Sequence, residues 1–298
     1  MLLTFNYKRN SGVALIQVLL ISAVLSLLAI QLNKSAKINT HLTQGFNDKT
    51  SALIHLKTVE TQLLYEMLLA NDRKVDKTGA NFFGQPFHFD DSTVVSIQDT
   101  SGLHNVHFPS KAIIERWLSS IGQDEARADY IVRRLKDFQD SDNEVFGGGK
   151  EQDYYQVVEE QIQNIELSTE KHLSALLKGV GYTEAQVEEL VSISTAHSFT
   201  ASNPYHAPNK LIDMMYDANI SQQIKELRDS GSYTRQSFIN LTGIDEGEGI
   251  SFSTSPYLDI NITVSYGSAK MRKRLVVELI PFFKEEQGAL SFLFVKLS

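Results

Sequence analysis

The feature that most limits what this chain can fold into is an uninterrupted apolar run near its N-terminus, from Val13 to Leu32, with no charge and no proline. Twenty helical residues at about 1.5 Å each span roughly 30 Å, the thickness of the hydrocarbon core of a bilayer. A secretory signal peptide has a shorter apolar region, about 7–15 residues, followed by a small-x-small cleavage site. The sequence Gln31–Ser35 offers no such site, and an apolar twenty-residue run at a chain terminus is not typical of a buried core helix. We therefore expect one transmembrane helix over residues 13–32.

The distribution of charged residues indicates on which side of the membrane each end of this helix lies and which classes of partner the protein can bind. Lys8 and Arg9 precede the run, so the positive-inside tendency keeps the N-terminus cytoplasmic and the body on the other side of the membrane. The net charge is −8, and without the first twelve residues it is −10. Such an acidic body repels phosphate backbones, which argues against nucleic acid as a partner. The chain has no cysteine, which excludes disulfides, thiolate metal sites and a cysteine nucleophile.

The residues just before the run give it a more specific meaning. Lys8-Arg9-Asn10-Ser11-Gly12 followed by Val13 resembles the leader junction of type IV prepilins and pseudopilins. In that family a prepilin peptidase cuts after the glycine on the cytoplasmic side, and the new N-terminus is methylated. The resemblance implies a leader of residues 1–12, cleavage between Gly12 and Val13, and a protein held in the inner membrane with its body in the periplasm.

One position departs from the prepilin pattern. The family usually carries glutamate at the fifth mature position, where this chain has Gln17. That glutamate is thought to meet the N-terminal amine of the next subunit in the filament, because an unpaired ion in apolar surroundings is costly. A subunit with nothing stacked above it does not need the carboxylate. Gln17 therefore points to a minor subunit at a filament tip.

The helix is expected to continue beyond the membrane. Apolar residues recur at spacings of three and four, and no proline occurs before Pro86, which predicts one helix from Val13 to about Ala70. The expected strands, rich in β-branched and aromatic residues, are Pro86–Phe89, Thr93–Gln98, Tyr257–Tyr266, Met271–Pro281 and Leu290–Leu297. The last three are joined by turns around Gly267-Ser268 and Glu286-Gln287-Gly288, which suggests a meander.

About 150 residues of mostly helical pattern separate the two groups of strands. Amphipathic helices are expected at Ile113–Ile121, Tyr130–Phe138, Glu170–Leu177, Glu184–Ser194, Asn209–Tyr216 and Ile220–Ser230. The predicted fold class is α+β: a pilin-like long N-terminal helix plus an antiparallel sheet, with a large all-helical domain inserted between its strands. The expected division is 1–12 leader, 13–32 transmembrane helix, 33–108 spine and first strands, 109–251 inserted helical domain, and 252–298 C-terminal strands.

The densest group of potential metal ligands lies in the segment from Asp137 to Tyr155. Counted from Asp140, carboxylates fall at positions one, three, five and twelve, which partly imitates a calcium-binding EF-hand loop. Position six is Val145 where the tight turn needs glycine, so a true EF-hand is not expected. Spacing leaves two interpretations, a calcium site and a solvated acidic turn capped by glycines.

The same string is similar to the pattern Asp-Trp-x-Asp-x-Asp…Gly-Ala-Glu-x-Asp-Tyr-Tyr of the protein K family, the large minor pseudopilins of type II secretion systems. Gly102–Val106 resembles that family's Gly-x-Phe-Asn-Leu-Asn segment, and Asn203–Pro208 its Asn-x-Ala-Pro segment. The matching residues are Asp137, Asp140, Asp142, Gly149, Glu151, Asp153, Tyr154 and Tyr155, with Phe138 in place of tryptophan and Lys150 in place of alanine. The resemblance implies a pilin fold with a helical insertion and bound structural calcium. The implied ligand candidates are Asp140, Asp142, Glu151 and Asp153.

The role that this resemblance implies is mechanical. With other minor pseudopilins, such a protein caps the tip of the pseudopilus and starts its assembly from the major pseudopilin, so that the filament can export folded proteins. The alternative that stays open is a minor pilin of a type IV pilus or a related system, which belongs to the same superfamily.

Enzymatic and DNA-binding interpretations find little support. The histidines are scattered, with no His-x-x-x-His or Glu-x-x-His pair to hold zinc, and the common nucleophile and phosphate-binding motifs are absent. We expect no catalytic residue. The turn Gly179-Val180-Gly181 resembles a helix-hairpin-helix, but the acidic balance favours a plain connection between two helices.

Overall fold

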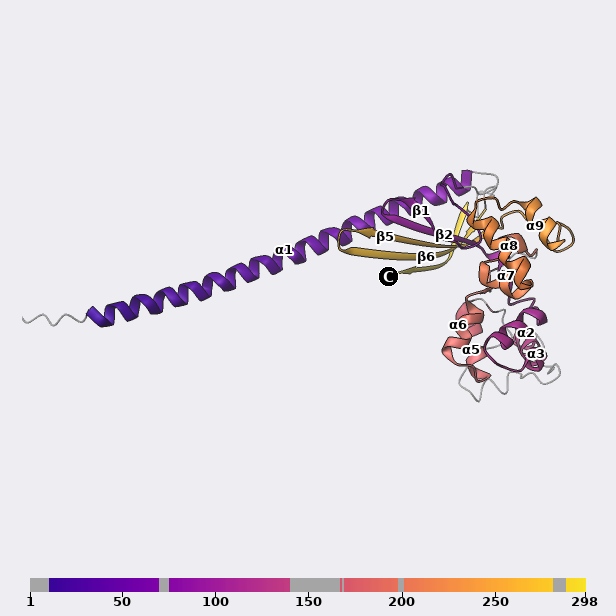
Figure 1. Cartoon of the computed structure of the whole chain (residues 1–298), viewed down its shortest axis with the longest axis horizontal. Helices are drawn as coiled ribbons and strands as arrows, with labels where there is room; N and C mark the ends of the chain where they lie inside the picture. The colour runs from indigo at the N-terminus through magenta and orange to yellow at the C-terminus, as the bar shows by residue number, and fades with distance from the viewer. Residues whose placement is uncertain (1–10, 70–74, 140–166, 168, 198–200, 281–287) are drawn as a thin grey trace, which may run out of the picture. The chain divides into compact units, whose positions relative to one another are not determined.

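The computed structural model describes residues 11–69, 75–139, 167, 169–197, 201–280 and 288–298. It contains two compact units, one of residues 1–54 with 265–270 and one of residues 55–264 with 271–298 (Figure 1). The helices are α1 Ser11–Leu69, α2 Lys111–Ser120, α3 Ala128–Asp137, α5 Glu170–Gly179, α6 Glu184–Val191, α7 Asn209–Met215, α8 Ala218–Asp229 and α9 Arg235–Thr242. The strands are β1 Phe87–Asp90, β2 Thr93–Asp99, β3 His104–Asn105, β4 Ser194–Thr195, β5 Tyr257–Tyr266, β6 Ala269–Leu279 and β7 Leu290–Leu297.

The first unit joins the N-terminal part of α1 to the tip of the β5–β6 hairpin. The carboxylate of Asp48 on α1 accepts hydrogen bonds from the Ser268 backbone N (2.8 Å) and hydroxyl (2.9 Å), and these bonds lower the pKa of Asp48. Gly267 in the hairpin turn has φ of +53°, and a Cβ at this position would collide with the Asp48 carboxylate. The predicted turn at Gly267-Ser268 is confirmed, and glycine suits this position because it adopts a positive φ without steric cost.

The second unit contains a five-stranded sheet in the order β1-β2-β5-β6-β7. The pairs β1–β2, β2–β5 and β6–β7 are antiparallel. Strand β2 pairs with β5 along its whole length, although more than 150 residues separate them in the chain. The prediction that a helical block is inserted between strands of one sheet is therefore confirmed.

From His55 onward, α1 packs on one face of this sheet. Its buried side chains include Leu56, Leu63 and Met67, all completely inaccessible. Polar contacts fix both flanks of the helix: His55 Nε2 lies 2.9 Å from Asp90 Oδ2 at the end of β1, and Glu60 Oε2 accepts from Lys273 Nζ on β6 at 2.6 Å. Every second residue of β5 is buried beneath the helix, because successive side chains of a strand point to opposite faces of the sheet. These buried residues are Leu258, Ile260, Ile262 and Val264.

The helical block between β2 and β5 has its own hydrophobic core. Trp117 of α2 is completely buried in this core, packs against Tyr182 with tilted rings whose centroids are 4.9 Å apart, and donates its indole N–H to the Gln186 carbonyl. Helices α5 and α6 form a hairpin whose turn residue Gly181 has φ of +99°. The turn singled out in the sequence is thus a connection between two packed helices.

One helix and one pair of strands were not predicted, and the strand expected at Met271–Pro281 is observed as Ala269–Leu279. Helix α9 was not predicted because only Phe238 is fully buried on it, so its apolar periodicity is weak, although Thr234 caps its start and Gly243 (φ +69°) ends it. The parallel pair β3–β4 was missed because two-residue strands leave no alternation to detect. The predicted turn at Glu286-Gln287-Gly288 lies largely outside the described residues.

Candidate functional site

The sequence-predicted leader junction lies at the start of α1. Gly12 and Val13 fall in its first turn, and Gln17 follows one turn later. The apolar side chains from Val13 to Leu32 are exposed throughout. Among the described residues this is the one helix long and apolar enough to cross a membrane, and none of its apolar window is buried. This arrangement fits a single membrane span followed by a soluble body.

The proposed calcium ligands Asp140, Asp142, Glu151 and Asp153 lie outside the described residues. Asp137, at the start of the same acidic string, is the last residue of α3 and is buried. Within the described ranges no group of three or more histidine or carboxylate side chains is placed to hold a metal ion.

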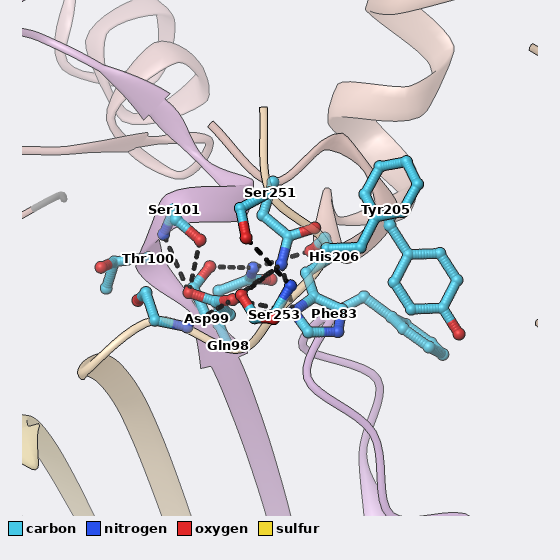
Figure 2. A network of polar contacts seen from close by, with 12 residues as sticks. Phe83, Gln98, Asp99, Thr100, Ser101, Tyr205, His206, Ser251 and Ser253 are labelled. Atoms are coloured by element: carbon cyan, nitrogen blue, oxygen red, sulfur yellow. Dashed lines mark hydrogen bonds and ion pairs between the residues drawn. The ribbon is translucent and has the colours of Figure 1, made fainter. Parts of the chain in front are cut away.

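The most elaborate polar site in the described chain surrounds Asp99, the last residue of β2 (Figure 2). Its Oδ1 accepts from the Ser101 backbone N (3.0 Å) and hydroxyl (2.8 Å). Its Oδ2 faces His206 Nδ1 (2.8 Å), Asn203 Nδ2 (3.2 Å) and the Ser255 backbone N (3.2 Å). The Asp99 side chain is fully buried and that of His206 is 8% exposed. We call Asp99, Ser101, Asn203, His206 and Ser255 the Asp99 junction.

The Asp99 junction ties together three separate parts of the chain. Asp99 stands where the chain leaves the sheet, Ser255 stands just before it re-enters at β5, and His206 comes from the middle of the helical block. Burial raises the pKa of Asp99, but the hydrogen bonds from His206, Ser255 and Ser101 outweigh it and the pKa is lowered below its ordinary value. The carboxylate is therefore ionised at neutral pH.

The hydrogen bonds of the Asp99 junction hold segments of the chain together and do not form a catalytic relay. An aspartate–histidine pair beside serines invites comparison with a nucleophilic relay, in which a serine hydroxyl donates to the histidine. Here the Ser101 hydroxyl donates to Asp99 itself, and the Ser255 hydroxyl donates to the Tyr257 carbonyl. Neither hydroxyl donates to the histidine, which therefore is not placed to activate either serine as a nucleophile.

Two segments noted in the sequence meet at this joint. Gly102 packs so closely on the His206 carbonyl that a Cβ would collide with it. The Asn203 backbone N donates to the Ser101 carbonyl (2.8 Å), and Gln98 Nε2 donates to the His206 carbonyl (3.0 Å). The segments Gly102–Val106 and Asn203–Pro208, about 100 residues apart, therefore form one contact. Asp99 itself was not predicted, since no local spacing signals a partner 107 positions away.

Next to this contact lies a buried histidine, His104 on β3. Its Nε2 accepts from the Ser110 backbone N (3.0 Å), so the neutral ring carries its proton on Nδ1, which donates to the Ser194 hydroxyl (3.2 Å). Burial lowers the pKa of His104 to about 4. A second proton would turn Nε2 into a donor facing the Ser110 N–H.

A second polar link joins the sheet to the helical block. Arg274 on β6 donates to both Asp259 oxygens on β5 (Nε distances 3.1 and 3.0 Å) and reaches Glu170 at the start of α5 (2.9 Å from Nη1). Burial lowers the pKa of Arg274, but the bonds to Glu170 and Asp259 raise it further than burial lowers it. The guanidinium therefore bridges two carboxylates across the interface.

Comparisons with known proteins bear on the fold. No protein-family model matches the sequence, and no curated protein matches it. Among solved structures, one chain of the GspK-GspI-GspJ complex from the enterotoxigenic Escherichia coli Type 2 Secretion System is similar, with a TM-score of 0.53 and 13% sequence identity. The alignment covers 86% of this chain and 99% of that chain.

The likeness extends over nearly the whole chain and defines the class of the fold. The protein has an α+β, pilin-like architecture of the kind found in type II secretion pseudopilins: a long N-terminal helix, an antiparallel sheet, and further helices. The fold class predicted from the sequence is confirmed.

Proposed function

We propose that this protein is a minor pseudopilin of a type II secretion system, a structural and non-enzymatic subunit at the tip of the periplasmic pseudopilus that initiates its assembly. The observation that carries the proposal is the pilin-like sheet interrupted between β2 and β5 by a helical block, in a fold similar to that of a chain from a pseudopilin complex. The apolar N-terminal half of α1 supplies the inner-membrane anchor, which leaves the body in the periplasm.

Processing and position follow from the N-terminal sequence. The prepilin peptidase cleaves between Gly12 and Val13 and the new amine is methylated. Gln17 provides no carboxylate for the amine of a following subunit, which suits a terminal position. The partners are the other minor pseudopilins, as in the complex named above, and the major pseudopilin below them.

The test is isolation of the full-length protein from membranes in which it is expressed with the minor subunits of a type II secretion system. We expect those subunits to be retained with it, and mass spectrometry to find methylated Val13 as its N-terminus. Parallel expression with the minor pilins of a type IV pilus serves as the control. Retention of the pilus subunits instead, or an N-terminus at Met1, would contradict the proposal.

The acidic segment is proposed to bind structural calcium. The donor set of Asp140, Asp142, Glu151 and Asp153 is made of hard carboxylate oxygens, the chemistry that Ca²⁺ prefers. Bound calcium would neutralise the clustered charges and stabilise the folded state by mass action.

Calcium should raise the melting temperature of the protein by several degrees, because a ligand held at 100 times its dissociation constant contributes about 2.7 kcal/mol. Thermal unfolding with 1 mM calcium and with chelator measures the shift. The double variant Asp140→Ala/Asp142→Ala should lose it, whereas Glu188→Ala, an exposed acid on α6, should keep it. Equal melting temperatures with and without calcium would remove the metal from the proposal.

A further inference from the structure

The edge strand β7 leaves part of one sheet face uncovered. In the β6–β7 ladder, Lys273 pairs with Leu297, Leu275 with Val295, and Val277 with Phe292. Paired residues in an antiparallel ladder direct their side chains to the same face. Because the Lys273 side chain binds Glu60 of α1, this is the face on which α1 packs.

Helix α1 covers this face as far as β6 and stops short of β7. Leu275 and Val277 are completely buried, whereas Phe292, Val295 and Leu297 are 48%, 50% and 50% exposed. We call these three residues the β7 strip. Contiguous exposed apolar side chains on an edge strand are a liability unless another surface covers them.

The β7 strip lies where a second helix, packed beside α1 on the same face of the sheet, would contact the sheet. Two packed helices lie about 8–10 Å apart, and neighbouring strands lie about 4.8 Å apart. A helix packed alongside α1 on this face is therefore displaced by about two strands, which brings it over the edge of the sheet. The six residues from Phe292 to Leu297 span roughly 17 Å, about three turns of a helix.

Charge beside the strip indicates what that helix carries. Lys273 and Lys57 both donate to Glu60, at 2.6 and 3.2 Å, so two ammonium groups share one carboxylate. The Lys57 side chain is 62% exposed, and Lys273 is the ladder partner of Leu297. This cluster has one positive charge in excess, which an acidic side chain would balance.

We propose that the β7 strip, together with Lys57, binds the amphipathic N-terminal helix of another pilin-type subunit. The apolar stripe of that helix packs on Phe292, Val295 and Leu297, and an acidic residue lies near Lys57. The inference rests on the proposed function, since it takes the partner to be another pseudopilin.

The test uses the full chain expressed with the other minor pseudopilins. Val295→Asp and Lys57→Glu should each reduce the amount of co-purified subunit at least tenfold. Lys296→Asp is the matched control, because it changes an exposed residue of the same strand whose ladder partner, Arg274, belongs to the opposite face. A photo-reactive phenylalanine analogue at position 292 should cross-link to the N-terminal helix of a partner subunit.

Each result bears on the proposal. Wild-type retention by both strip variants, or a cross-link to a partner strand or to a second copy of this chain, would overturn it. If Val295→Asp lowers the melting temperature, the conservative Val295→Thr and the cross-link still decide the question. If the unmodified protein retains no pseudopilin, the proposed function itself fails. If the unmodified protein and both strip variants retain equal amounts of partner, the proposed function stands and only the binding site is wrong.

Discussion

Replacing Asp99 by alanine is expected to lower the free energy of unfolding by about 3–5 kcal/mol, because several donors lose their acceptor in a buried site and each unpaired donor costs about 1–3 kcal/mol. The carboxylate is fully buried and accepts five hydrogen bonds, two from Ser101 and one each from Asn203, His206 and Ser255. Removing it takes an acceptor away from each of these donors at a position where the Asp99 side chain is fully buried. Urea unfolding at pH 7 of a version lacking residues 1–36 measures the loss.

The chain contains a matched control for this prediction. Asp90 also accepts from the backbone N and hydroxyl of the serine two positions on, Ser92, and also pairs with a histidine, His55 at 2.9 Å. The difference is burial, since both side chains of that pair are 35% exposed. Asp90→Ala should therefore cost about 1 kcal/mol or less, as exposed pairs do. Equal losses for the two variants would show that burial does not determine the strength of the Asp99 junction.

The second large effect is a loss of stability on acidification caused by His104. Its pKa is about 4 in the folded protein and 6.5 unperturbed, so between these values the unfolded chain binds a proton that the folded chain does not. Stability from this residue is complete above pH 6.5 and falls as the pH drops to 4. A shift of this size corresponds to about 3 kcal/mol.

His104→Gln should reduce this pH dependence, since its amide oxygen can still accept from the Ser110 N–H but does not titrate. Unfolding free energies measured at intervals from pH 7 to pH 4 give the slope for each variant. His88→Gln, at an exposed position on β1, should retain the wild-type slope. A wild-type slope in His104→Gln would mean that other groups produce the acid sensitivity.

The long-range order of the fold was predictable where the sequence pattern is strong. The absence of proline before Pro86 and the apolar periodicity predicted a helix from Val13 to about Ala70, and α1 is Ser11–Leu69. The strand Tyr257–Tyr266 was predicted with its observed bounds, because strict alternation of buried residues marks a strand packed on one face. Strands expected at both ends of the chain implied an inserted block, and the β2–β5 pairing shows it.

Other features required the tertiary structure. His206 was one of several scattered histidines in the sequence, and its pairing with Asp99 depends on the return of the chain through the helical block. The β7 strip was visible only as an apolar C-terminal strand, and its exposure depends on where α1 ends its coverage of the sheet.

The sequence by itself determined the long apolar N-terminal helix and most of the succession of helices and strands, because these depend on residues that are neighbours along the chain. Cleavage at Gly12–Val13 stays a prediction from the sequence. Only the tertiary structure decided which polar groups share a buried site and which apolar side chains stay uncovered. Burial depends on contacts between distant segments, and the same Asp–x–Ser sequence gives a half-exposed pair at Asp90 and a buried junction at Asp99.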